Sequence, residues 1–73
     1  MTTVYNFEVA NNHNYYVGSN QILAHNKGGG GCFEAGTLIT KDSSFEKIEN
    51  IRAGDIVLSY NEYTGKNEYS KVL

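Results

Sequence analysis

The fold class is decided by residues 56–72, which read IVLSYNEYTGKNEYSKV. Apolar and polar residues alternate on both sides of a short polar stretch, which is the period-two pattern of β-strands. Gly65 lies in that stretch and can adopt the positive φ that a tight turn needs. The pattern predicts a β-hairpin, with strands at residues 56–60 and 68–72 joined by a turn at residues 62–66.

The first 26 residues also contain patterns typical of short strands. Residues 4–10 are rich in β-branched and aromatic side chains, and Tyr5, Phe7 and Val9 share one face of the predicted strand. A polar turn at residues 11–14 follows. A second strand at 15–17, a turn at 18–20 and an extended segment at 21–24 complete a small predicted meander.

Between these regions, residues 37–40 predict another strand. Ser43 and Glu46 have the spacing of a capping box, which predicts one helical turn with Phe45 and Ile48 facing inward. Helix is a minor feature of this prediction. The fold class that we expect is therefore all-β, built from short strands and hairpins.

Length and composition exclude several classes of protein. With 73 residues, one hydrophobic core supplies only about 3–5 kcal/mol of stability. The single cysteine cannot form an internal disulfide or a multi-cysteine zinc site, and we expect no metal and no cofactor. A net charge of -2 argues against a nucleic-acid partner. The sequence has no membrane-spanning stretch and no secretory signal, so we expect no membrane partner and, as a recombinant protein, a cytoplasmic location.

The charge distribution indicates that two different segments have been joined. Residues 1–31 contain only Glu8 and Lys27 as charged residues, and all other acids and bases follow. At the junction lies KGGGG (residues 27–31), a run typical of a flexible linker. Its position between unlike segments, behind an initiator Met1, favours an engineered fusion. We therefore divide the chain into residues 1–26, a linker at 27–31 and residues 32–73.

Three positions could carry chemistry, and each also has an ordinary structural interpretation. Cys32 follows the glycine run and has the carbonyl of Gly31 directly before it; alternatively it is a small buried apolar residue. Asn26 could attack its own backbone carbonyl if His25 protonated the leaving amine; alternatively the pair is a polar turn. His13 is alternatively a surface turn residue.

The residues around these three positions resemble the Hint superfamily, which includes inteins, bacterial intein-like domains and hedgehog autoprocessing domains. The segment from Cys32 through Leu58, which begins CFEAGTLI, is similar to the opening motif of that family. The segment from Val4 through Asn26, which ends in His25-Asn26, is similar to its closing motif. The closing motif stands first in this chain. The resemblance therefore implies a circularly permuted Hint-like fold, or half of one, with residues 27–31 in the extein position.

The resemblance implies an autocatalytic function related to protein splicing, with the protein as its own substrate. Cys32 would attack the carbonyl of Gly31 and form a thioester. Asn26 would cyclise and break its bond to Lys27, with His25 and His13 as proton donors or orienting groups. At most, this is single-turnover autoprocessing.

Two departures from the family pattern limit the expected activity. The Thr-x-x-His motif that assists the first step in inteins is absent, and Lys27 stands where splicing requires Cys, Ser or Thr. We therefore expect slow or absent cleavage in place of ligation.

The missing middle of the domain leaves strand edges uncovered, which predicts either an isologous homodimer or a complementing fragment in trans. An interpretation from another class is a non-catalytic β scaffold or self-associating module.

Overall fold

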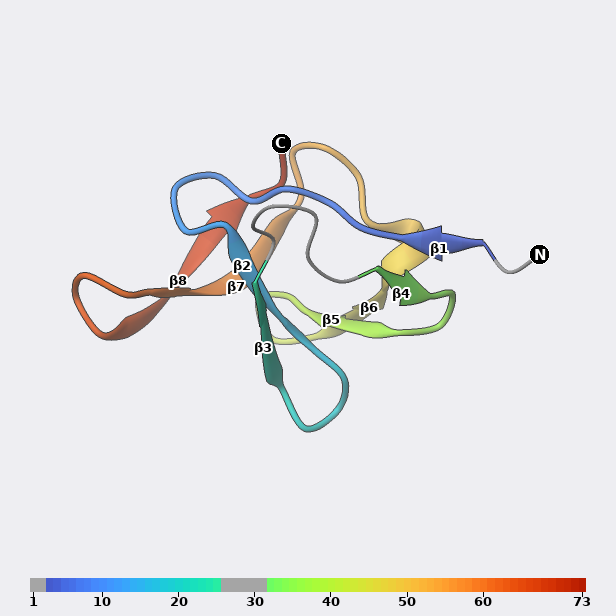
Figure 1. The fold of residues 1–73 in the computed structure, drawn as a ribbon, viewed down its shortest axis with the longest axis horizontal. Coiled ribbons are helices and arrows are strands. Elements are labelled where there is room, and N and C mark those ends of the chain that lie inside the picture. Colours follow the sequence, from blue (N-terminus) through green and yellow to red (C-terminus); the bar gives the residue numbers. More distant parts are fainter. Residues whose placement is uncertain (1–2, 26–31) are drawn as a thin grey trace.

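A computed structural model describes residues 3–25 and 32–73 of the chain. Every described strand is short, and one 3₁₀ turn accompanies the strands (Figure 1). The elements are β1 (Val4–Tyr5), β2 (Asn14–Val17), β3 (Ile22–His25), β4 (Phe33–Glu34), β5 (Leu38–Thr40), β6 (Phe45–Lys47), η1 (Ile48–Asn50), β7 (Ile56–Asn61) and β8 (Lys66–Lys71). The described residues form no α-helix, which confirms the all-β class.

The strands form three antiparallel sheets. β1 pairs with β4, β7 pairs with β8, and the largest sheet has the order β3-β2-β5-β6. In Figure 1 the β7–β8 hairpin and the β1–β4 pair lie on opposite sides of the molecule, and β2 passes between them. Two of the sheets combine strands from before and after residues 26–31: β1 with β4, and β2 with β5, in which Val17 lies opposite Ile39.

The predicted hairpin at the end of the chain is confirmed. β7 and β8 pair over six positions, from Ile56 opposite Lys71 to Asn61 opposite Lys66. Gly65 has a φ of 71° at the turn, as the sequence predicts. The strands expected near residues 15–17, 21–24 and 37–40 are also present, as β2, β3 and β5.

The predicted helical turn at Ser43 is wrong. Ser43 has a φ of 63°, whereas the residue that caps a helix N-terminus lies in the β region. The segment instead forms the β5–β6 hairpin, which the Lys41 N–H closes by donating to the Ser44 carbonyl at 2.8 Å. Phe45 is 47% exposed, contrary to its predicted inward position, whereas Ile48 is buried as expected.

The predicted strand at residues 4–10 is shorter than expected. Only Val4–Tyr5 forms a strand, and Val9 makes a single bridge to Val72. Asn6 explains part of the interruption, because its Oδ1 accepts a hydrogen bond from the Phe7 N–H at 2.8 Å. β1 pairs with β4 and not with β2, so residues 4–24 do not form the predicted meander.

The core collects apolar side chains from both halves of the chain. Tyr15 is at its centre: its ring stacks on Phe7 at 4.0 Å between centroids and meets the ring of Phe33 edge-on at 6.2 Å. The buried apolar residues are Val9, Tyr15, Val17, Ile39, Ile48, Val57 and Val72. Because residues from β2, β5 and β7 meet here, each half of the chain depends on the other for its core.

Within the described residues, no helix is long and apolar enough to cross a membrane.

Candidate functional site

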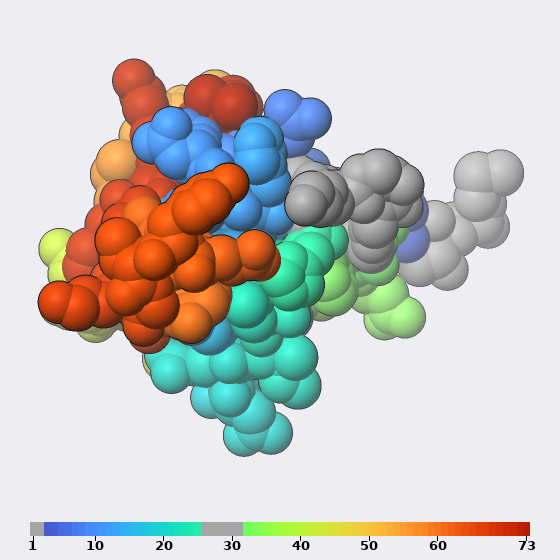
Figure 2. All heavy atoms as spheres, turned by 60° about the vertical axis from the view of Figure 1, so that its left-hand side comes forward, coloured from blue at the N-terminus to red at the C-terminus, as the bar shows by residue number. Residues whose placement is uncertain are grey.

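Both histidines of the chain line one small pocket. The pocket has a volume of about 100 Å³ and is open to solvent. In Figure 2 the orange turn between β7 and β8 lies next to the end of β3 and the blue segment that precedes β2. The lining residues come from these three places: Asn11, Asn12, His13, His25, Glu62 and Tyr63. The fold therefore brings together two predicted site residues that are twelve positions apart in the sequence.

A tight turn presents His13. Asn11 and His13 have φ values of 71° and 55°, in the left-handed region that few residues other than glycine adopt without strain. Asparagine tolerates that region better than most residues, which suits an Asn-rich turn. The Asn12 side chain anchors the turn, because its amide nitrogen donates to Ser59 Oγ at 2.8 Å and to Glu68 Oε2 at 2.9 Å.

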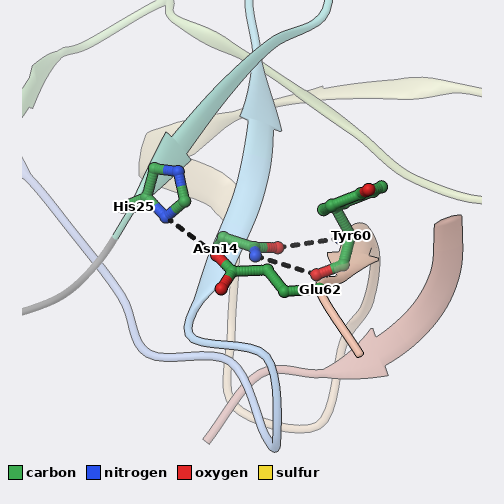
Figure 3. Close-up of polar contacts among 4 residues, drawn as sticks. All are labelled: Asn14, His25, Tyr60 and Glu62. Atoms are coloured by element: carbon green, nitrogen blue, oxygen red, sulfur yellow. Dashed lines mark hydrogen bonds and ion pairs between the residues drawn. The ribbon is translucent and has the colours of Figure 1, made fainter. Parts of the chain in front are cut away.

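His25 ends β3 and faces Glu62, the first residue after β7. The distance between His25 Nδ1 and Glu62 Oε1 is 3.7 Å (Figure 3). Both side chains are more than half exposed, so this ion pair forms when the imidazole is protonated and solvent screens it. Glu62 also lines the pocket, and no sequence pattern indicates it.

Asn14 fixes β2 and β7 to each other beside this pair. It is fully buried, its Oδ1 accepts the Tyr60 N–H at 2.8 Å, and its amide donates to the Tyr60 carbonyl at 2.9 Å (Figure 3). The side chain thus serves as a strand partner for one residue of β7. Asn14 also lies opposite His25 in the β2–β3 pair, so the same residue aligns both strands that carry the pocket.

Cys32 lies apart from the histidines. Its thiol is exposed and free, and within the described part of the chain no hydrogen bond or pocket joins it to His13 or His25. Burial and, to a smaller extent, the charge of the Cys32 thiolate raise the pKa of Tyr15 to about 12. The exposed thiol does not fit the alternative of a small buried apolar residue.

The remaining predicted site residues, Asn26, Lys27 and Gly31, lie outside the described residues. Across residues 3–25 and 32–73, no group of three or more His, Cys, Asp or Glu side chains is placed to hold a metal ion.

Comparison with known proteins adds no relative. No family model matches the chain, and no curated protein or solved structure matches it significantly. The interpretation of the site therefore depends on the chemistry of its residues.

Proposed function

We propose that this chain is a truncated, permuted Hint-like domain that cleaves its own backbone slowly at the Asn26–Lys27 bond. The observation that supports the proposal is the shared pocket of His13 and His25, since His25 directly precedes Asn26 in the sequence. Imidazole is the side chain that best exchanges protons near neutral pH. The pocket thus offers two such groups, one of which directly precedes in sequence an asparagine whose leaving amine needs a proton.

In the proposed reaction, the side-chain nitrogen of Asn26 bonds to its own backbone carbonyl carbon. The bond between that carbon and the Lys27 nitrogen breaks, and the nitrogen leaves as an amine after it receives a proton. The products are a fragment that ends in a succinimide and a fragment that begins with Lys27. That proton comes from His25 or His13, and the attacking Asn26 nitrogen loses one of its own protons as it becomes the imide N–H.

The second proposed step is at Cys32, whose sulfur attacks the Gly31 carbonyl and exchanges an amide for a thioester. An added small thiol then takes over the acyl group and releases residues 32–73 with a free amine. The exposure of the Cys32 thiol supports access of such a reagent.

Intact-mass spectrometry under denaturing conditions tests both steps. The protein is incubated for days at neutral pH, with and without a small thiol. We expect a 1–26 fragment one water lighter than its free acid, which Asn26→Ala abolishes, and a thiol-dependent 32–73 fragment, which Cys32→Ala abolishes. A single unchanged mass under both conditions would refute autoprocessing.

A second candidate function is a non-catalytic, self-associating β module. A groove of about 220 Å³ between the β5–β6 hairpin and the β7–β8 hairpin supports it, because Phe45 and Tyr69 line the groove and remain 47% and 52% exposed. Exposed aromatic side chains of this kind favour association. Sedimentation at high micromolar concentration distinguishes the cases: a homodimer supports self-association, and a monomer contradicts it.

A further inference from the structure

One carboxylate joins the two turns that form the pocket. Glu68 Oε2 accepts from the amide of Asn12 at 2.9 Å, and its Oε1 accepts from the amide of Asn61 at 3.2 Å. Asn12 directly precedes His13, and Asn61 directly precedes Glu62. Glu68 therefore holds the turn that carries His13 and the turn that carries Glu62 at a fixed separation. We call these three residues the Asn12–Glu68–Asn61 bridge.

Each end of this bridge is itself ordered. Asn61 Oδ1 accepts the backbone N–H groups of Tyr63 and Thr64 at 2.9 and 3.2 Å, which is an Asx-type turn around Glu62. At the other end, Asn12 also bonds Ser59 on β7. Side-chain hydrogen bonds thus fix the backbone on both sides of the pocket, although its histidine and carboxylate side chains are exposed.

Glu62 is directed at one particular nitrogen of His25. Its Oε1 lies 3.7 Å from Nδ1 (Figure 3). The two hydrogen bonds between Asn14 and Tyr60 join β7, which Glu62 follows, to β2, the strand that pairs with β3 and its terminal His25. A carboxylate near one imidazole nitrogen favours a proton on that nitrogen. The other nitrogen, Nε2, is then the one that exchanges protons with a reacting group.

We propose that Glu62 is a positioning residue for His25, and that the Asn12–Glu68–Asn61 bridge sets the placement of Glu62 and His13 around it. This inference rests on the proposed cleavage at Asn26. In that reaction the doubly protonated imidazole of His25 gives its Nε2 proton to the departing Lys27 nitrogen while the Asn26–Lys27 bond breaks, and the proton that the attacking Asn26 nitrogen loses passes to solvent. Glu62 acts through His25 and does not contact the reacting bond.

Cleavage kinetics of Glu62→Ala provide the first test. We expect the rate at Asn26 to fall about two- to fivefold, the range that an exposed ion pair supports. Thiol-dependent cleavage at Cys32 should keep its rate, because Cys32 lies outside the pocket. General destabilisation would slow both reactions equally. Glu8→Ala is the matched control, since Glu8 is exposed and its loss changes the charge by the same amount.

A second variant tests the bridge. Glu68→Gln keeps the size of the side chain but offers one acceptor oxygen where two amides now donate, so one of the two amides loses its bond to this side chain. We expect cleavage at Asn26 to slow, because His13 or Glu62 is then held less firmly, while Glu8→Gln leaves it unchanged. Equal rates in both variants would overturn the role of the bridge.

Imidazole nitrogen chemical shifts test the inference without requiring cleavage. Nuclear magnetic resonance spectra of the neutral imidazole should show the Nδ1-protonated tautomer of His25 enriched in the unaltered protein, and the Nε2-protonated tautomer gaining in Glu62→Ala. An unchanged tautomer ratio would overturn the role of Glu62. An uncleaved protein with the expected tautomer change would refute the proposed function and leave the placement of His25 established.

Discussion

Asn14→Ala should remove most of the stability of this domain. The Asn14 amide satisfies both backbone groups of Tyr60, at 2.8 and 2.9 Å, and Asn14 is fully buried. Each backbone group left unpaired in a buried site costs about 1–3 kcal/mol. Tyr60 is itself only half-buried, so water compensates in part and we expect a loss of about 2–4 kcal/mol. That approaches the roughly 3–5 kcal/mol available to a chain of this size.

Urea unfolding followed by circular dichroism or tyrosine fluorescence measures this loss, since the chain has six tyrosines and no tryptophan. Asn20→Ala is the matched control, because Asn20 is exposed in the turn between β2 and β3. We expect the control to unfold like the unaltered protein. An Asn14→Ala variant with the same urea midpoint as the control would refute the assignment of Asn14 as a substitute strand partner.

Asn14→Asp adds a test of the geometry through pH. The protonated carboxyl can accept the Tyr60 N–H and donate to the Tyr60 carbonyl, whereas the carboxylate can only accept. The folded-state pKa of the new carboxyl therefore lies above its unfolded value of about 3.9. Stability is then present below that unfolded pKa and is lost as pH rises through the folded one. A variant that is destabilised equally at pH 3.5 and pH 7, relative to the unaltered protein, would contradict this arrangement.

Three further predictions concern other parts of the fold. Thr40 Oγ1 is buried without a hydrogen-bond partner among the described residues. Thr40→Val should therefore raise the free energy of unfolding, measured by urea titration, by about 1 kcal/mol. A lower free energy of unfolding would show that the hydroxyl has a partner. The Gly36 N–H donates to Glu49 Oε1 at 2.7 Å and holds the pKa of Glu49 below its usual value. The stability from that bond is present above the unfolded pKa of a glutamate and is lost as pH falls through the lowered folded pKa. Glu49→Gln should therefore make acid unfolding less steep. An acid transition identical to that of the unaltered protein would contradict this prediction. The pKa of Tyr15 is raised to about 12. The stability from its neutral phenol is therefore present below pH ~10 and is lost toward pH 12. An ultraviolet titration should show one tyrosine that ionises at higher pH than the others, and six tyrosines that titrate together would contradict this.

Local pattern predicts much of this fold. The alternation in residues 56–72 and the glycine at position 65 specify the β7–β8 hairpin, because both signals act within a few residues. The error at Ser43 has the same local origin. A capping box and a hairpin turn both favour Ser and Asp, and pairing between β5 and β6 decided between them. β4, with two residues, is too short to produce a periodic signal.

The composition of the pocket could be predicted only in part. The chemistry of imidazole and the resemblance to a family motif both point to the two histidines, but neither gives information about Glu62 or Glu68. Contacts with Asn14 and Asn12 span 46 and 56 positions of sequence, respectively. Such contacts depend on how β2 packs against β7, and periodicity within one strand does not reveal the register between strands that do not share a ladder.

The interleaving of strands from both halves of the chain determines the fate of a cleaved molecule. β1–β4, β2–β5 and the bridge between Val9 and Val72 would still hold the two fragments together after the backbone broke between them. In the intact chain, a short connection holds the two parts at a local concentration in the millimolar range. Cleavage removes that connection, so association of the fragments would then depend on the protein concentration. At micromolar protein, losing that connection costs about 4 kcal/mol, comparable with the whole stability of a domain this small. After cleavage, the two fragments would therefore stay associated at high protein concentration and dissociate at low concentration.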